Sequence, residues 1–185
     1  MDSGDKQLID NFIAGDDSAF SELVKKYLKP VYNFLYHFVS DREALDDITQ
    51  ETFIKAWKHI EKFDRSRNFK VWIFSIAKNT AFDYLKKKKT IPFSNFTDDE
   101  GNNRLDNVGD DSILPHEILI RADSAKLLEE KLKKIPDIYR IILIMHYKED
   151  FSLQEIAKIL DKSYNTIKSQ HQRGLAKLRE TFLEN

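Results

Sequence analysis

Aromatic and basic side chains gather in residues 62–90. This segment carries nine Lys or Arg residues against two acidic ones, a net charge of +7, and it includes Phe69 and Trp72. Aromatic rings stack on unpaired bases while cations follow the phosphate backbone, so the combination favours contact with single-stranded nucleic acid. The alternative for the lysine run 86–89 is a solvated helix end, where cations complement the helix dipole.

A second set of chemically suited residues lies near the C-terminus. Ser152 and Glu155 have the S-x-x-E spacing of a capping box, and Ser163 can cap a second helix after a tight turn. This pattern predicts a helix-turn-helix, whose second helix can enter the major groove. Side chains suited to base edges and phosphates face outward there: Tyr164, Asn165, Thr166, Lys168, Ser169, His171, Gln172 and Arg173. A helical hairpin with a polar face is the alternative.

The total charge of the chain hides strong local charges. The 185 residues include 30 Lys or Arg and 31 Asp or Glu, for a net charge of −1. Residues 91–120, however, carry a net charge of −6 directly after the +7 segment. Such asymmetry indicates an anionic partner for the basic segment. The absence of Cys excludes disulfides and thiolate zinc sites, and no glycine-rich phosphate motif, HExxH or GxSxG occurs.

Apolar residues recur with helical spacing through most of the chain, which predicts an all-α protein. Helices are expected over residues 18–39, with Pro30 kinking or dividing the first, over 42–60 and over 70–88. Further helices are expected from Pro115 to Ile135, from Asp137 to Tyr147, and in the helix-turn-helix.

Between the two helical parts, the polar and acidic composition of residues 91–112 predicts a flexible acidic linker. The expected architecture is therefore two small helical domains, residues 1–90 and 113–185, with the helix-turn-helix in the second.

Three segments resemble the bacterial extracytoplasmic-function (ECF) sigma factors, a group within the sigma-70 family of RNA polymerase subunits. Residues 45–57, LDDITQETFIKAW, are similar to the family's AEDLxQExFxxAW segment. Residues 69–79 with 83–86 are similar to FxxWLxxIAxN…DxxR. Residues 135–169 contain counterparts of LP…R…EIA…xTVKS. The segments follow the family's order on either side of the acidic linker, which makes the resemblance specific.

The resemblance covers about residues 18–88 and 115–182. It implies a promoter-specificity subunit that binds RNA polymerase core and directs initiation through minus-10 and minus-35 elements. The polymerase-core-binding residues that it implies are Asp46, Asp47, Gln50, Glu51, Phe53 and Trp57. The alternative for Phe53 and Trp57 is packing in a core, and the alternative for the other four is a solvated helix face.

By the same resemblance, the basic aromatic segment contacts the minus-10 element as its strands separate. The minus-10 residues would be Arg65, Arg67, Phe69, Trp72, Asn79, Asp83, Lys86 and Lys87. Trp72 suits a core position as well, and Asn79 suits a plain helix surface. The outward residues of the helix-turn-helix would read the minus-35 element from the duplex.

Four positions depart from the family pattern. Gln170 stands where Arg is common, which would weaken a phosphate contact or change the promoter sequence that is read. Gly174 stands where Ala is usual, at a cost of about 1 kcal/mol in helix propensity. Asp150 and Asp161 stand at turn positions where Gly is frequent. Asp tolerates the left-handed conformation better than most residues, so both turns are expected to persist.

Two other functions compete with the sigma-factor hypothesis. A free-standing helix-turn-helix regulator would have no need of an acidic docking helix followed by an aromatic and basic one. A hydrolase using Asp46 and Asp47 has no supporting His, Ser or metal-ligand pattern, and adjacent helical positions point about 100° apart.

We therefore expect a protein without catalysis of its own and without cofactor or metal. The polar N-terminus shows no signal peptide, and the apolar run 141–145 is too short to span a membrane, so a cytoplasmic protein without membrane insertion is expected. The resemblance further implies an anti-sigma factor as partner, a protein that in this family is often membrane-bound.

Overall fold

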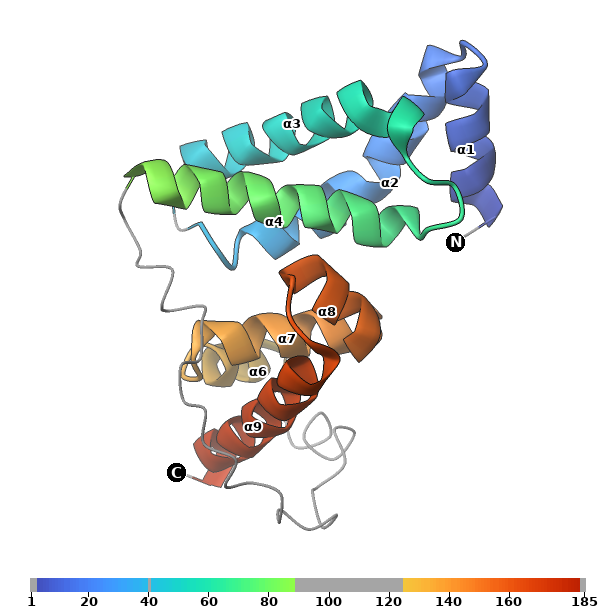
Figure 1. Cartoon of the computed structure of the whole chain (residues 1–185). Coiled ribbons are helices and arrows are strands. Elements are labelled where there is room, and N and C mark those ends of the chain that lie inside the picture. Colours follow the sequence, from blue (N-terminus) through green and yellow to red (C-terminus); the bar gives the residue numbers. More distant parts are fainter. Residues whose placement is uncertain (1–2, 40, 89–124, 184–185) are drawn as a thin grey trace. The chain divides into compact units, whose positions relative to one another are not determined.

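The computed structural model of the chain describes residues 3–39, 41–88 and 125–183 (Figure 1). These residues form helices and no strand, which confirms the predicted all-α class. The N-terminal elements are α1 (Ser3–Ile13), α2 (Asp17–Leu35), α3 (Arg42–His59), the short 3-10 helix η1 (Ile60–Lys62) and α4 (Phe69–Lys88). The C-terminal elements are α6 (Ala125–Leu132), α7 (Asp137–Tyr147), α8 (Leu153–Leu160) and α9 (Tyr164–Leu183).

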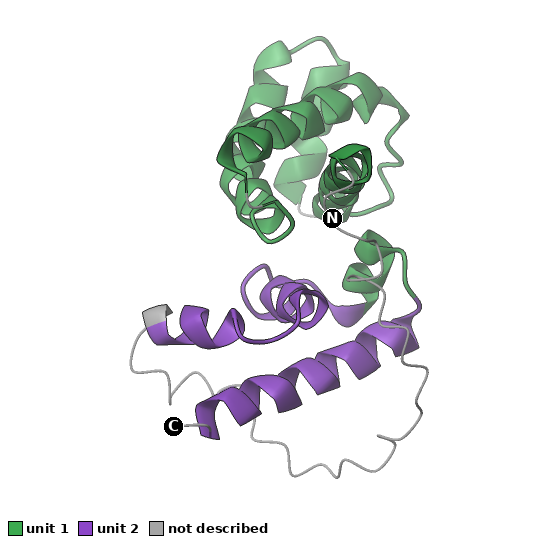
Figure 2. Ribbon diagram, turned by 90° about the vertical axis from the view of Figure 1, so that its left-hand side faces the viewer, with its two compact units in different colours: residues 1–91, 154–162 green, residues 92–153, 163–185 purple. Residues whose placement is uncertain are grey.

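The described chain divides into two compact units (Figure 2). The first consists of residues 1–91 with 154–162, and the second of residues 92–153 with 163–185. The predicted acidic linker, residues 91–112, lies outside the described residues. The predicted domain limits therefore stay a prediction.

Helices α2, α3 and α4 form the core of the first unit, because each contributes an apolar stripe to a shared interior. Aromatic side chains dominate this interior: the ring of Phe34 on α2 lies 5.0 Å from that of Phe74 on α4. The Tyr27 and Phe69 rings, on the same two helices, are 5.4 Å apart. Helix α2 runs through Pro30 as one helix and is not divided there.

Helix α1 is an element that the sequence analysis did not predict. It packs against α2 through the side chain of Asp5, which is 1% exposed. The Tyr27 hydroxyl donates to one Asp5 oxygen at 2.5 Å, and the Lys26 ammonium binds the other at 2.6 Å. In sequence the segment resembles a polar tail, because a carboxylate such as Asp5 is normally exposed. In the structure this buried carboxylate and apolar residues such as Ile9 attach the helix to α2.

In the second unit, α9 packs against α6 and α7. Helix α7 begins directly after Pro136, as predicted, and buries most of the apolar run 141–145. Lys131 on α6 donates a hydrogen bond to the carbonyl oxygen of Thr181 on α9. Of the helix predicted to start after Pro115, the described part is α6.

Gly174 lies where α9 packs closely against α7. A Cβ atom at this position would be 3.1 Å from the Tyr139 Cβ and 3.5 Å from the Leu143 side chain. A Cβ atom moves only with its backbone, so α7 itself would have to shift. Close helix packing therefore explains the glycine that helix propensity alone disfavours.

We expect Gly174→Leu to lower the free energy of unfolding of the second unit by about 1–3 kcal/mol, because the added side chain overpacks the α7–α9 contact. Urea unfolding of the whole chain, followed by NMR signals from α7 and α9, measures the change. Ala176→Leu makes a similar enlargement at an exposed position of the same helix and serves as the control. Equal stability of the two variants would contradict the packing explanation.

Candidate functional site

The exposed face of α3 carries the polar residues that the sequence predicts for docking. The Asp41 side chain caps the helix by accepting from the backbone N–H groups of Glu43 and Ala44. The bond from the Ala44 N–H is the main cause that holds the pKa of Asp41 below its ordinary value. The nearby Lys88 ammonium and the Glu43 bond lower this pKa further. The helical repeat then turns two polar pairs one turn apart outward: Asp46 with Asp47, and Gln50 with Glu51, all exposed.

A groove of about 790 Å³ runs along this face between α2 and α3. Its lining is largely apolar and includes Leu28, Ile54 and Trp57, three large side chains that remain exposed. Asp46 and Gln50 line it from α3, so predicted docking residues border the groove. The sequence analysis missed Leu28 and Ile54. Ile54 has polar residues at its helical neighbours Gln50, Glu51 and Lys58, and this was its signal. Leu28 gave no such signal, because it continues an apolar stripe that looks buried.

The two aromatic docking candidates differ in burial. Phe53 is 8% exposed and packs inward, although it also lines the groove. Trp57 is 52% exposed, so its ring presents a large apolar area to solvent. Core packing therefore describes Phe53, whereas Trp57 is free to contact a partner.

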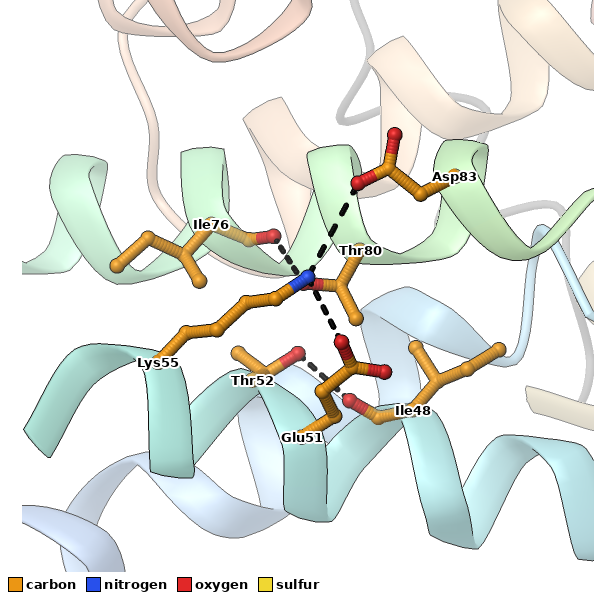
Figure 3. Close-up of polar contacts among 7 residues, drawn as sticks. All are labelled: Ile48, Glu51, Thr52, Lys55, Ile76, Thr80 and Asp83. Carbon is orange, nitrogen blue, oxygen red and sulfur yellow. Dashed lines mark hydrogen bonds and ion pairs between the residues drawn. The ribbon is translucent and has the colours of Figure 1, made fainter. Parts of the chain in front are cut away.

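Lys55 joins α3 to α4 (Figure 3). Its Nζ lies 2.9 Å from Glu51 Oε1 on α3 and 3.9 Å from Asp83 Oδ2 on α4. The same ammonium donates to the Thr80 hydroxyl at 3.2 Å. Lys55 thus contacts one predicted docking residue and one predicted minus-10 residue. The sequence analysis did not identify it, since nothing in the spacing of the chain shows which helices pack together.

The loop before α4 is ordered by carboxylates. Asp64 accepts from the backbone N–H of Ser66 at 3.0 Å and from its hydroxyl at 2.7 Å. Both bonds lower the pKa of Asp64, and the bond from the Ser66 hydroxyl has the larger effect. Arg67 pairs with Asp64 at 3.2 Å, and Arg65 pairs with Asp10 of α1 at 2.8 Å. Both arginines predicted to contact DNA are thus exposed to solvent, and each is paired with an aspartate.

Helix α4 separates its predicted minus-10 residues into a buried and an exposed group. Phe69 is fully buried, its ring 5.7 Å from Phe63 and 5.5 Å from Trp72, so it supports Trp72 from below. Trp72 is partly exposed. The exposed residues of the set on this helix are Asn79, Asp83, Lys86 and Lys87.

A tight turn connects α8 to α9. Asp161 takes a φ of 55°, as does Asp150 before α8, which confirms the left-handed conformation expected at both positions. The Ser163 hydroxyl accepts from the backbone N–H of Thr166 at 3.0 Å and caps α9 as predicted. On the first turns of α9, the exposed candidates are Tyr164, Asn165, Lys168 and Gln172, and the partly exposed ones are Thr166, Ser169, His171 and Arg173.

His171 packs against α7, which separates it from the other candidates. Its Nε2 lies 3.0 Å from the Tyr147 hydroxyl, and its ring lies 5.1 Å from that of His146. Burial, assisted by the neighbouring His146, lowers the pKa of His171 to about 4. The imidazole is therefore neutral near pH 7 and brings no positive charge to a phosphate.

The depressed pKa predicts a loss of stability in acid. The unfolded chain binds a proton at His171 near pH 6.5, whereas the folded chain does so only near pH 4. Stability is thus fully present above pH 6.5 and falls as the pH drops toward 4, by at most about 1.4 kcal/mol per pH unit. Urea unfolding of α7 and α9 at several pH values measures this slope.

His171→Gln removes the titrating ring and should flatten the slope, while His59→Gln, at an exposed position of α3, should leave it unchanged. A slope that is the same in wild type and His171→Gln would show that His171 titrates normally.

The described ranges also bear on membrane and metal binding. None of the helices within 3–39, 41–88 and 125–183 is long and apolar enough to cross a membrane. The same residues contain no group of three or more His, Asp or Glu side chains placed to hold a metal ion.

Family profiles match both helical parts of the chain. The profile described as Sigma-70 region 2 matches residues 23–91, which include α3, α4 and the loop between them. The profile described as Sigma-70, region 4 matches residues 125–178, which include the helix-turn-helix. The two matches thus identify a protein built from sigma-70 regions 2 and 4.

Curated relatives give the group within that class. The chain is 30% identical over 177 residues to the ECF RNA polymerase sigma factor SigW of Bacillus subtilis, covering 95% of each chain. It is 28% identical to SigX of the same organism, covering 89% of this chain and 84% of SigX. The chain belongs to the ECF sigma factors of the sigma-70 family. It is a promoter-specific sigma subunit that binds RNA polymerase core and directs transcription initiation.

Solved structures share the fold. CnrH, described in complex with the cytosolic domain of CnrY, matches with a TM-score of 0.67 at 21% identity over 99% of both chains. The sigma factor RpoE of Bartonella quintana, described in complex with the anti-sigma factor NepR, matches with a TM-score of 0.63 at 22% identity. This match covers 88% of the present chain and 96% of RpoE.

Proposed function

We propose that the α2–α3 groove and the polar stripe of α3 form the surface that binds RNA polymerase core. The observation that carries this assignment is the exposed Trp57 in an apolar groove bordered by Asp46 and Gln50. Interfaces are typically apolar at their centre and polar at their rim, and exposed tryptophans are frequent binding hot spots. Asp47 and Glu51 extend the polar side of this docking surface.

We propose further that α4 and its preceding loop bind the minus-10 element during strand separation. The partly exposed Trp72, supported by Phe69, offers a face for an unpaired base. Arg65, Arg67, Lys86 and Lys87 offer cations for phosphates. The carboxylate of Asp83 and the amide of Asn79 can serve base edges.

The beginning of α9 is the proposed reader of the minus-35 duplex. Asn165 and Gln172 have the side-chain amides that pair with adenine, and Lys168 and Arg173 can bind guanine or phosphate. His171 has a different part, because its neutral ring fixes α9 against α7. Two modest contacts with one promoter reinforce each other through effective concentration when a linker joins them.

The protein would contribute binding and no catalysis of its own, and it would act in the cytoplasm, where RNA polymerase works. We also propose an anti-sigma factor as a partner. The support is that two solved proteins of the same fold are described in complexes, one of them with a named anti-sigma factor. Such a partner would cover the docking surface and compete with polymerase.

Transcription in vitro tests the proposal. Purified core polymerase and a library of promoter fragments are incubated with and without the protein, and transcripts are sequenced. We expect a distinct set of transcripts that depends on the protein and shares two spaced sequence elements. Failure to produce any dependent transcript while the protein binds core would refute the assignment of promoter recognition to α4 and α9.

A further inference from the structure

We propose that Lys55 is a positioning residue that couples polymerase docking to DNA binding. The inference rests on the proposed function, which places Glu51 on the docking surface and Asp83 on the DNA-binding helix. Lys55 itself belongs to neither set, but it contacts one member of each (Figure 3). Coupling requires an element that both sites bias, and this shared ammonium is such an element.

The two carboxylates compete for one cation. In the free protein, Lys55 Nζ is 2.9 Å from Glu51 Oε1 and 3.9 Å from Asp83 Oδ2, so it favours Glu51. Glu51 and Asp83 are both well exposed, with side chains 56% and 69% accessible, whereas the Lys55 side chain is 34% accessible. Both acids are open to external partners while the cation stays between the helices.

One threonine on α4 gives this ammonium a fixed acceptor, whereas the nearby threonine of α3 bonds only within its own helix. The Thr80 hydroxyl accepts from Lys55 at 3.2 Å and donates to the Ile76 carbonyl at 2.9 Å. Across the helix interface, Thr52 donates to the Ile48 carbonyl at 2.7 Å. Thr80 thus offers Nζ a fixed acceptor, and only a small movement separates the Glu51 contact from a closer Asp83 contact.

Docking changes which acid the ammonium neutralises. When a polymerase group engages Glu51, Lys55 loses its nearest anion and moves toward Asp83. Asp83 lies one turn before Lys86 and Lys87. In the free protein Lys55 lies 3.9 Å from it and compensates its charge only weakly, so the carboxylate opposes the approach of DNA phosphates there. Neutralising Asp83 removes this repulsion, and the affinity of α4 for a DNA strand rises. The protein thereby binds DNA better once it is attached to core.

Glu51→Gln imitates the docked state without polymerase. The full-length variant is compared with Asp47→Asn, which changes the net charge equally one turn earlier on α3 and removes neither carboxylate that Lys55 contacts. Binding of a labelled single-stranded oligonucleotide of mixed sequence is measured at low salt, where phosphate contacts are strongest. We expect Glu51→Gln to bind about threefold more tightly than Asp47→Asn, the size that one partly exposed ion pair supports.

The same pair of charge variants in a Lys55→Met background isolates the role of the ammonium, because methionine retains the apolar stem. In that background the two charge variants should bind equally. Equal binding of Glu51→Gln and Asp47→Asn when Lys55 is present would overturn the inference, as would a threefold difference that persists in the Lys55→Met background. Absence of strand binding by every variant would overturn it as well. Transcription dependent on the protein would still stand in each case, so the two proposals fail separately.

Discussion

Replacing Gln50 and Trp57 together by alanine is expected to weaken binding to RNA polymerase core by at least about 30-fold. Truncation of a hot-spot tryptophan commonly costs about 2 kcal/mol or more, which corresponds to this factor. Trp57 is the most exposed large aromatic residue of the docking surface, and Gln50 borders the same groove. The loss should appear mainly as faster dissociation, because contacts in a formed complex set the off-rate. Surface-coupled core polymerase and full-length variants measure it directly.

A matched control is available in Tyr36. This residue follows α2, is 49% exposed against 52% for Trp57, and does not line the groove. Tyr36→Ala should therefore leave core affinity unchanged, although it removes a similar aromatic area from the surface. If the Gln50→Ala/Trp57→Ala variant binds core as tightly as Tyr36→Ala does, the docking surface lies elsewhere.

Alanine at Lys168 and Arg173 is expected to weaken binding of a promoter duplex about tenfold and to flatten its salt dependence. Each phosphate contact adds about 0.9 to the slope of log affinity against log salt concentration, so loss of both should reduce the slope by about 1.8. If Arg173 instead contacts a base edge, affinity would fall for one sequence only and the slope would change by about half as much. Titration of full-length protein with a duplex from the transcription library, at several salt concentrations, distinguishes these results.

Lys177 provides the control on the same helix. It is exposed one turn beyond Arg173, outside the proposed reading residues. Lys177→Ala changes the net charge of α9 as either single variant does, and we expect it to preserve the slope. A slope that falls equally in Lys177→Ala would show that general charge on α9, rather than contacts at its beginning, governs duplex binding.

The helices of the core were predictable because their apolar residues repeat at the helical period. The predicted segments 42–60 and 70–88 correspond closely to α3 and α4, and the break after Pro136 is where α7 begins. Local capping chemistry was equally readable, as Ser163 shows. Helix α1 escaped prediction, since one of the groups that fix it to α2 is the acidic side chain of Asp5, which in sequence looks like a solvent-exposed charge.

Burial of individual candidates was beyond the sequence. Phe53 and Trp57 lie four positions apart on α3 and have similar chemistry, yet one is 8% exposed and the other 52%. Likewise, Phe69 is buried and Trp72 only partly so, although both are aromatic residues at the start of α4. Which side of a helix faces its neighbours depends on the packing of all three helices, and an amphipathic stripe has edges that periodicity alone leaves open.

The sequence by itself determined the class of this protein, because three motifs in order, a basic aromatic segment and a capped helix-turn-helix are local patterns. Only the tertiary structure decided how the helices combine into surfaces. It brought Leu28 on α2 and Trp57 on α3 into the lining of one groove, placed Lys55 between Glu51 and Asp83, and required Gly174 where α9 meets α7. Distances between residues remote in sequence follow from packing geometry, and no single segment of the chain contains that information.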